Sequence, residues 1–386
     1  MSFDVALKLL NERSWKPVPL AEPIPVSSLP TPALLIDESA LDRNIKRMAD
    51  FVAARGKNAR PHGKTHKCPI IAARQIEAGA VGICAAKVSE AAVFVNAGVE
   101  PVLITSPVTT AAKAELIVAL ARKGRVSVVV DGPLALQVLR EAACPDAEVG
   151  VLVDIDVDMG RTGCRDPDQV LALAESIETT PGLRYEGVQH YAGHLMHVEG
   201  HQNRRRRSTA LWEQVAGVVD RLRQNGLAPA VVTGGGTGTY DIDTDIEAVT
   251  DVQVGSYVFM DHEYRIIGGA RGEVFDDFEV ALTVAATAIS KPLDSAVTVD
   301  AGYKAFASDT VAPEPMHIAG ARYRFAGDEH GVVIPAAGSQ EPLLGEVHQF
   351  ITSHCDPTVN LYDHYWVHRD GLAHSIWPVA ARGCSW

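Results

Sequence analysis

Several features that would assign this chain to other protein classes are missing from its sequence. No apolar run is long enough to span a bilayer, and the N-terminal stretch lacks the apolar core of a secretory signal. The six cysteines are scattered without a CxxC pair, which excludes a zinc ribbon and favours reduced thiols over a disulfide framework. We therefore expect a cytoplasmic protein without a membrane-spanning segment.

Positive charge is also in short supply. The formal net charge is -13, which argues against nucleic acid or an anionic membrane as the main partner. The single basic block, residues 204–207, is a run of four arginines inside a stretch that predicts a helix. We expect this block to form a solvated face or an edge that faces an anion.

What is present is a regular alternation of short β-branched runs with longer helical patterns, beginning near residue 40. This rhythm is typical of a parallel sheet covered by helices. The eight strand candidates are "NARP" at 58, "GICAAK" at 82, "PVLIT" at 101, "VSVVVD" at 126, "VGVLVDID" at 149, "YEGVQHY" at 185, "AVVTG" at 230 and "VQVGSYVF" at 252. Eight strands predict a TIM-like (β/α)8 barrel over residues 40–268. The alternative is a doubly wound sheet, but its GxGxxG fingerprint is missing.

After about residue 270 the rhythm changes to strand-length runs separated by Gly, Pro and Asp. This pattern predicts a β-rich second domain over residues 269–386. The early segment "TPALLID" at 31 adds a strand to it, so residues 1–39 are assigned to the same domain.

The stretch "ARPHGKTHKC", residues 59–68, concentrates titratable nitrogen directly after the first strand candidate. Barrel enzymes place their reactive groups at such strand ends, so Lys64 would point into the barrel mouth. Burial near other cationic groups can lower the pKa of a lysine and make it a nucleophile toward carbonyl groups. The alternative is a solvated lysine in a turn.

Two later strand candidates end in glycine-rich turns, "TGGGTGTYD" at 233–241 and "QVGSY" at 253–257. Such turns let backbone N–H groups approach an anion closely. The first run lacks the GK[ST] ending of an ATP-binding loop, which leaves a monophosphate as the expected ligand. A reactive lysine together with a monophosphate site fits pyridoxal 5'-phosphate (PLP), bound to the lysine as a Schiff base.

A third pattern, "SHCDP" at 353–357, places His354 and Asp356 two residues apart. On an extended strand these side chains would share one face and could converge on a cation. An imidazole and a carboxylate suit Mn²⁺ or Mg²⁺, and Zn²⁺ and Co²⁺ are also feasible. A strand pair with its own hydrogen bonds is the alternative.

The motifs "RPHGKTHK", "DVDMGRTGC", "QHYAGH", "TGGGTG", "VGSYVFMD", "DEHG" and "SHCDPTVNLYD" occur in this order from about residue 30 to the C-terminus. Together they resemble the D-threonine aldolase and D-serine dehydratase family, PLP enzymes with the alanine-racemase-like fold. The His-x-Asp pair resembles the aldolases, because the D-serine dehydratases have His-x-Cys and prefer zinc.

The resemblance implies a role for each matching residue. Lys64 would carry the cofactor, Arg161 would bind its ring or phenolic oxygen, and Tyr191 would contact the ring edge or nitrogen. His197, with His194 as the second candidate, would bind the substrate hydroxyl or transfer its proton. The expected phosphate-binding residues are Gly235, Gly236, Thr237, Gly255, Ser256 and Tyr257.

The expected activity is that of a PLP- and metal-dependent D-threonine aldolase, with Mn²⁺ as the preferred ion. It would reversibly cleave β-hydroxy-D-amino acids to glycine and an aldehyde, and the resemblance implies a homodimer. The alternatives are a D-serine or D-threo-3-hydroxyaspartate dehydratase, a 3-hydroxyaspartate aldolase, and a PLP-binding protein without catalytic activity.

Overall fold

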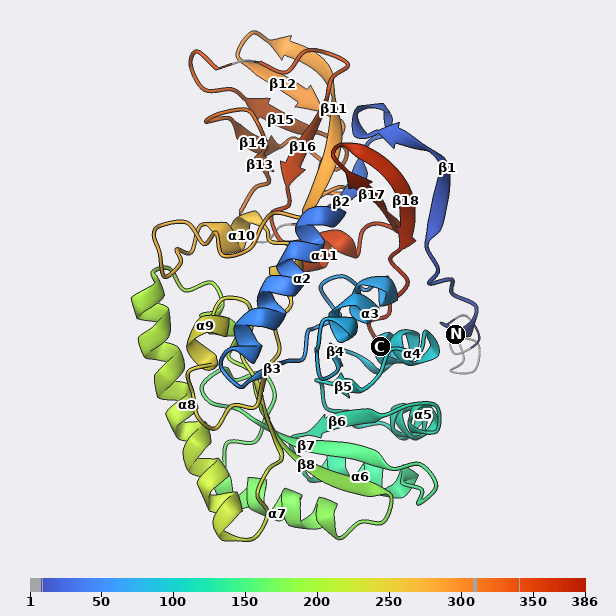
Figure 1. The fold of residues 1–386 in the computed structure, drawn as a ribbon, viewed down its shortest axis with the longest axis vertical. Coiled ribbons are helices and arrows are strands. Elements are labelled where there is room, and N and C mark those ends of the chain that lie inside the picture. The colour runs from blue at the N-terminus through green and yellow to red at the C-terminus, as the bar shows by residue number, and fades with distance from the viewer. Residues whose placement is uncertain (1–7, 9, 308–310, 340) are drawn as a thin grey trace.

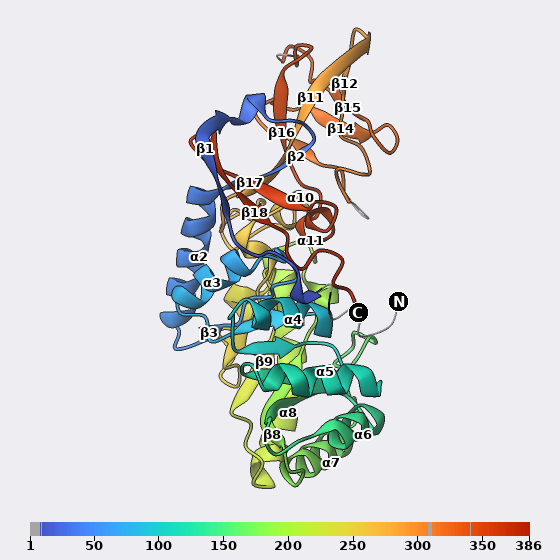
Figure 2. The ribbon, with the colours of Figure 1, turned by 90° about the vertical axis from the view of Figure 1, so that its right-hand side faces the viewer.

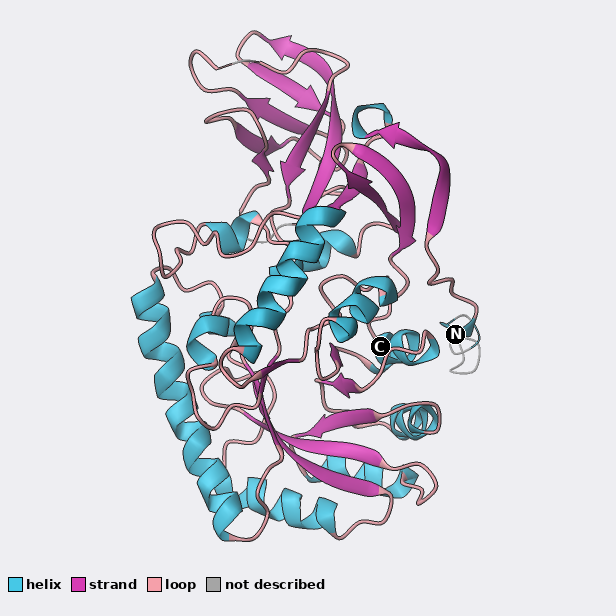
Figure 3. Ribbon diagram, in the orientation of Figure 1, coloured by secondary structure: helices cyan, strands magenta, loops and turns pink. Residues whose placement is uncertain are grey.

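The structure is a computed structural model that describes residue 8 and residues 10–307, 311–339 and 341–386. Figure 1 shows two β-sheets, with most of the helices packed around the lower one. Figure 3, in the same orientation, shows that the upper part consists mainly of strands. Among the described residues, no helix combines the length and the apolar character needed to cross a bilayer.

The lower sheet is parallel and is built from the eight predicted strand regions. Its strands are β3 (Asn58–Ala59), β4 (Ile83–Ala85), β5 (Val102–Ile104), β6 (Val126–Val130), β7 (Val149–Ile155), β8 (Leu183–His190), β9 (Val231–Gly234) and β10 (Asp251–Val252). They pair in the order β3-β10-β9-β8-β7-β6-β5-β4. The two ends of this path meet, because His62, just after β3, forms a parallel bridge with Cys84 in β4. The sheet is therefore closed, which confirms the predicted barrel over the doubly wound alternative.

Helices follow the barrel strands and cover the outside of the sheet (Figure 1). They are α3 (Pro69–Glu77), α4 (Val88–Asn96), α5 (Ala111–Ala121), α6 (Pro133–Ala142), α7 (Pro167–Glu178), α8 (His201–Gln224) and α9 (Tyr240–Asp243). Two further helices are α2 (Glu38–Ala53), which precedes β3 and packs against it, and α10 (His262–Arg265), which follows β10. Local sequence sets several of their ends. The carboxylate of Asp37 caps α2, proline opens α3, and Gly79 follows α3 with a φ of +108°.

The upper sheet is almost entirely antiparallel, which confirms the predicted β-rich part. Its strands are β1 (Val18–Pro25), β2 (Ala33–Asp37), β11 (Leu282–Leu293), β12 (Ala296–Val299), β13 (Glu314–Pro315), β14 (Arg322–Phe325), β15 (Gly331–Ile334), β16 (Val347–Ile351), β17 (His364–Arg369) and β18 (Leu372–Pro378). The main path runs β1-β18-β17-β2-β11-β12-β15-β14, and β16 pairs with β11 and β13. The β2 strand comes from "TPALLID" and pairs with β11 and β17.

The last barrel strand is shorter than the sequence indicated. The run "VQVGSYVF" predicts one strand, but β10 ends at Val252 and the short 3₁₀ helix η3 spans Ser256–Val258. The backbone leaves the extended region at Gly255, with φ -118° and ψ -76°. The chain therefore turns over the mouth of the barrel at this point.

The arginine run lies in α8, as predicted, but its first residue does not face solvent. Arg204 is fully buried, whereas Arg206 and Arg207 are exposed. Its guanidinium donates to the backbone carbonyls of Gly238, Val198, Ile267 and Gly268, at distances from 2.6 to 3.3 Å. The expectation of a solvated or anion-facing block is thus wrong for Arg204, because backbone oxygens take up its hydrogen-bonding capacity.

The two sheets are connected by short elements and side-chain hydrogen bonds. Both α10 and α11 (Cys355–Val359) lie between them in Figures 1 and 2. Asn44 in α2 donates to the carbonyls of Val258 and Glu279, and the Tyr365 hydroxyl in β17 donates to the His66 carbonyl at 2.6 Å. The second contact holds the loop that carries Lys64.

Candidate active site

The loop after β3 directs Lys64 into a hollow at the barrel mouth, beneath α11. Lys64 lines two adjoining cavities with volumes of about 90 and 410 Å³, which share His62, Tyr191 and Gln253 as further lining residues. The smaller cavity brings together many of the predicted site residues: Lys64, Tyr191, His197, Gly236, Thr237, Gly255, Ser256, His354 and Asp356. Residues from both sheets therefore meet around one amine.

The electrostatic environment of Lys64 differs from the expected one. Burial opposes the charged form, but the Tyr191 oxygen and the Asp356 carboxylate outweigh it and raise the pKa of Lys64 above its ordinary value. The Lys64 amine lies 3.6 Å from Asp356 Oδ2. The expectation of a lowered lysine pKa is thus wrong for this structure, because a carboxylate faces the amine across the cavity.

The histidines beside Lys64 shape its loop. His62 Nδ1 accepts the backbone N–H of Lys64, and His66 Nδ1 accepts that of Cys68. The His66 Nε2–H then donates to Gln75 Oε1 at 3.2 Å. Burial lowers the pKa of His66 to about 4, and burial together with the charge of Lys64 keeps the pKa of His62 well below its usual value. Both rings are therefore neutral near pH 7.

The two glycine turns present backbone to the cavity at short range. A Cβ at Gly236 would lie 2.6 Å from Met196 Sδ, and a Cβ at Gly255 would lie 2.5 Å from Thr65 Oγ1. Within the described parts of the chain, no acceptor takes the backbone N–H groups of Gly236, Thr237, Gly255 or Ser256. Such a concave set of amides fits a phosphate group.

Two predicted phosphate-binding residues lie outside the cavity lining. Gly235 has a φ of +65°, and a Cβ there would meet Asp243 Oδ2 at 2.2 Å, so glycine is needed for the turn itself. The Tyr257 hydroxyl is buried and accepts a hydrogen bond from Gln75 Nε2 at 3.0 Å. The Tyr257 backbone N–H donates to Thr237 Oγ1, which joins the two turns.

Arg161 and Tyr191 lie on the side of the larger cavity. The Arg161 guanidinium carbon is 5.1 Å from the centroid of the Tyr191 ring, and the Lys64 amine is 5.8 Å from the same centroid. The Arg161 loop is fixed by its neighbour Thr162, whose hydroxyl donates to Asp154 Oδ2 at 2.8 Å. Tyr191 thus lies within reach of both cations.

The strand geometry predicted for His354 and Asp356 is wrong. β16 ends at Ile351 and α11 begins at Cys355, so His354 is the residue before the helix and Asp356 lies in its first turn. Pro357 lies in that first turn, a position where proline favours helix over strand. Both side chains nevertheless line the Lys64 cavity.

This pair has the donor chemistry of a divalent metal site. Burial opposes ionisation of Asp356, but the neighbouring Lys64 amine and His354 ring lower its pKa to about 2, so the carboxylate stays charged. In the described ranges, no group of three or more His, Cys, Asp or Glu residues is arranged around a metal position. An imidazole and a carboxylate would therefore fit an ion that takes its other ligands from water or substrate.

The two candidate acid–base histidines occupy different environments. His197 lines the cavity, and its ring centroid lies 4.6 Å from that of Tyr264 and 6.1 Å from that of His354. His194 lies on the short helix η2 (Gly193–Leu195) and is not part of the cavity lining, although both side chains are partly open to solvent. The geometry favours His197.

Comparison with known proteins connects this geometry to a family. Residues 36–263 match the family model described as "Alanine racemase, N-terminal domain", and residues 281–368 match "Putative serine dehydratase domain". A D-threonine aldolase from Arthrobacter sp. is 38% identical over 370 residues, which cover 96% of this chain and 97% of that protein. The chain belongs to the D-threonine aldolase and D-serine dehydratase family. The resemblance inferred from the sequence motifs is confirmed.

Further members of this family of PLP-dependent lyases resemble the chain over nearly its whole length. A 3-hydroxy-D-aspartate aldolase from Paracoccus denitrificans (strain Pd 1222) is 36% identical, with 92% of this chain and 93% of that protein covered. The crystal structure of D-threonine aldolase from Filomicrobium marinum superposes with a TM-score of 0.91 at 38% identity. This match covers 95% of this chain and 100% of that chain.

Two acidic residues that the sequence-based assignment omitted connect the barrel of this family member to its His-x-Asp segment. Asp261 is buried, and its carboxylate accepts the backbone N–H groups of Tyr264 and Cys355, both at 2.9 Å. Glu263 Oε2 lies 3.4 Å from His354 Nδ1 and 3.6 Å from His197 Nε2. Asp261 ends the quoted motif "VGSYVFMD", whereas Glu263 follows it and has no sequence signal of its own.

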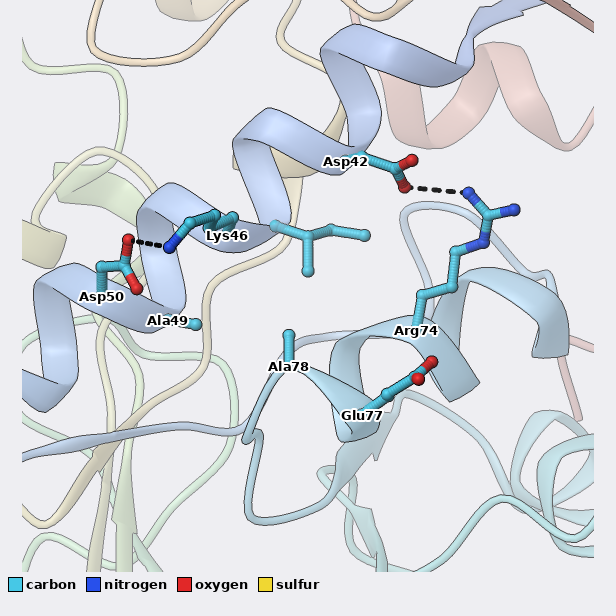
Figure 4. A pocket seen from close by; sticks show the side chains of 8 residues that line it. Asp42, Lys46, Ala49, Asp50, Arg74, Glu77 and Ala78 are labelled. Carbon is cyan, nitrogen blue, oxygen red and sulfur yellow. Dashed lines mark hydrogen bonds and ion pairs between the residues drawn. The ribbon is translucent and has the colours of Figure 1, made fainter.

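A larger hollow of about 500 Å³ lies elsewhere, between α2 and α3 (Figure 4). Its charged side chains are paired with one another: Arg74 with Asp42 at 2.8 Å, and Lys46 with Asp50 at 2.7 Å. It contains none of the nucleophile, glycine turns or imidazoles found at the barrel mouth. We therefore place the active site of this family member around Lys64.

Proposed function

We propose that this chain is a PLP- and divalent-metal-dependent D-threonine aldolase, which reversibly converts β-hydroxy-D-amino acids to glycine and an aldehyde. One observation carries the proposal: the Lys64 amine, the free amides of two glycine turns and the His354–Asp356 pair all line one cavity. The near-complete coverage of the 38% identical D-threonine aldolase supports the choice of reaction.

We assign PLP to the barrel mouth, with Lys64 as the residue that binds it covalently. Backbone amides at Gly236, Thr237, Gly255 and Ser256 would hold its phosphate, and Arg161 and Tyr191 would border its ring. When bound, PLP supplies an electron sink for the bond broken at the substrate Cα. Gly235 and Tyr257 support the turns from behind the cavity wall.

His354 and Asp356 would hold the divalent ion, with Mn²⁺ as our first choice and Mg²⁺, Co²⁺ or Zn²⁺ as alternatives. When bound, such an ion acts as a Lewis acid toward the substrate hydroxyl. His197 faces the same space and would accept the hydroxyl proton as the Cα–Cβ bond breaks. Burial lowers the pKa of His197 below its ordinary value, so its ring is neutral and ready to accept a proton near pH 7.

The domain division and the assembly are also proposals. We assign residues 40–268 to the PLP-binding barrel, and residues 1–39 and 269–386 to the β-rich domain that holds the metal. We further propose a homodimer, which membership of this family supports, and a cytoplasmic protein that acts on small molecules, which fits the acidic charge balance.

A 3-hydroxyaspartate aldolase is the second candidate, and one feature of the larger cavity favours it. Lys87 and Arg161 line this cavity beside Lys64, and their positive charges could accommodate a substrate with an acidic side chain. A 3-hydroxy-D-aspartate aldolase is also 36% identical over most of the chain. Rates with D-threonine and with 3-hydroxy-D-aspartate would separate the two.

The test is to incubate the purified enzyme, loaded with PLP and Mn²⁺, with D-threonine and identify the products. Acetaldehyde and glycine are expected. Formation of 2-oxobutanoate and ammonia would instead indicate a dehydratase, and cofactor absorbance without either product would indicate a PLP-binding protein without activity. Lys64→Ala should abolish both the absorbance of the bound cofactor and the reaction, and activity that persists after thorough chelation would reject the metal.

A further inference from the structure

A single buried carboxylate lies between the two imidazoles of the site. Glu263 belongs to α10, and its side chain is 8% exposed. Its Oε2 lies 3.4 Å from His354 Nδ1 and 3.6 Å from His197 Nε2, and the two ring centroids are 6.1 Å apart. One carboxylate oxygen therefore lies at ion-pair distance from one nitrogen of each ring.

The backbone fixes the position of this carboxylate relative to the His-x-Asp segment. The backbone N–H groups of His262 and Glu263 donate to the carbonyls of Thr352 and Ser353, at 2.9 and 3.1 Å. The Asp261 carboxylate caps α10 through Tyr264 and also accepts the Cys355 backbone N–H. The first turns of α10 and α11 are thus held together, which fixes the backbone of Glu263 relative to that of His354.

The two acidic residues consequently have different tasks. Both oxygens of Asp261 accept backbone N–H groups, so Asp261 fixes the main chain. Glu263 faces side chains. A carboxylate that accepts an imidazole N–H determines which ring nitrogen carries the proton and which way the other nitrogen points. For metal-binding histidines, such a partner commonly raises metal affinity by 10- to 100-fold.

We propose that Glu263 is a positioning residue that orients His354 and His197 together. It holds the proton on His354 Nδ1, which leaves His354 Nε2 for the metal, and on His197 Nε2, which leaves His197 Nδ1 for the substrate hydroxyl. One residue thereby couples the metal ligand to the proton acceptor. The inference rests on the proposed function for what the two histidines do, but the ring orientations themselves require no ligand.

The test compares the PLP-loaded wild-type enzyme with Glu263→Gln and Glu263→Ala. The control is Glu314→Gln. Glu314 of β13 pairs at 3.3 Å with Arg265, which lies on α10 like Glu263, and Glu314 is not part of the cavity lining. Ring ¹⁵N shifts of selectively labelled histidines, assigned with His197→Gln and His354→Gln, report the tautomers without metal. Free Mn²⁺, measured by electron paramagnetic resonance, reports metal affinity.

We expect single tautomers in the wild type, with protons on His354 Nδ1 and His197 Nε2. Glu263→Ala should give mixed tautomers and Mn²⁺ binding weakened by about 10- to 100-fold. Glu263→Gln should weaken Mn²⁺ binding less than Glu263→Ala does, and it should lower kcat by a larger factor than it raises KM. Glu314→Gln should match the wild type. Wild-type tautomers in Glu263→Ala, with circular dichroism showing a folded protein, would overturn the proposal. If the wild type binds no Mn²⁺, the metal assignment fails, and the tautomers still decide the role of Glu263.

Discussion

At the scale of single residues, Gly255 shows how little space the turn after β10 leaves for a side chain. The backbone of Gly255 has negative φ, so alanine is excluded there by space and not by conformation. A methyl group would lie 2.5 Å from Thr65 Oγ1, whereas the next contacts are at 3.7 Å. Gly255→Ala should therefore destabilise the protein by about 1–3 kcal/mol and weaken PLP retention.

The source of this cost can be tested with Thr65→Ala, which removes the clashing oxygen. In a double-mutant cycle, Gly255→Ala should lower the free energy of unfolding by less in the Thr65→Ala background than in the wild type. Urea unfolding measures the stability, and cofactor absorbance after gel filtration measures PLP retention. Simple additivity of the two substitutions would show that the clash with Thr65 is not the cause.

A second prediction at this scale concerns Asp154, whose carboxylate accepts hydrogen bonds from Gln189 and Thr162. Burial raises the pKa of Asp154 to about 6, above the value of about 3.9 for an unfolded chain. The folded state thus binds more protons between pH 4 and 6, so this residue's contribution to stability decreases as pH rises through that window.

Asp154→Asn removes this proton linkage and can keep both hydrogen bonds, because its amide accepts from Gln189 and donates to the Thr162 hydroxyl. Relative to the wild type, the variant should gain about 2 kcal/mol of unfolding free energy between pH 4 and pH 6.5. Denaturant unfolding at several pH values measures the difference. The exposed Asp294→Asn serves as control, and parallel pH profiles for wild type and Asp154→Asn would refute the prediction.

At the scale of elements, Arg204 of α8 joins three segments around the cavity. It binds carbonyls in the segment after η2 (Val198), in the glycine turn (Gly238) and after α10 (Ile267 and Gly268). A lysine ammonium lacks the planar guanidinium group that donates to all four carbonyls at once. We expect Arg204→Lys to lower the free energy of unfolding by about 2–4 kcal/mol, as measured by thermal unfolding. It should also weaken PLP binding, as measured by the absorbance of the bound cofactor.

Arg206→Lys provides the matched control on the same helix, because Arg206 is exposed and bonds only to Asn203 among the described residues. This substitution should change the stability by less than about 0.5 kcal/mol. Equal effects of the two substitutions would mean that the carbonyl contacts of Arg204 contribute nothing specific.

How far the sequence predicts the structure also differs between elements. The barrel strands could be predicted because most are short β-branched runs between helical patterns. Even β3, only two residues long, lies within the predicted "NARP". The i, i+2 spacing of the His-x-Asp segment predicts a strand, whereas a short helix begins at Cys355, with Pro357 in its first turn. The position of Glu263 and the buried role of Arg204 could not be predicted, because their partners come from distant segments and leave no local pattern.

At the scale of the whole molecule, the two sheets are joined at the site itself, so neither half completes it alone. The Tyr365 hydroxyl of β17 and the Ala381 backbone N–H bind the His66 and Lys67 carbonyls, on the loop that carries Lys64. Asp261 joins α10 to α11, and Asn44 of α2 binds the carbonyl of Glu279. The upper sheet therefore supports both the Lys64 loop and the segment that carries His354 and Asp356.

These shared contacts predict that the protein unfolds in a single cooperative transition. Separating the sheets would expose buried hydrogen bonds at Tyr365 and Asp261 before either core could melt independently. In scanning calorimetry, the calorimetric enthalpy of unfolding should equal the van't Hoff enthalpy, as it does for a single cooperative unit. Tyr365→Phe loses the hydrogen bond to the His66 carbonyl. It should lower the free energy of unfolding by about 1 kcal/mol and lower the midpoint temperature, while the transition stays single. Two resolved transitions in the wild type would show that the sheets are independent units, and that the Lys64 loop does not depend on the upper sheet for its position.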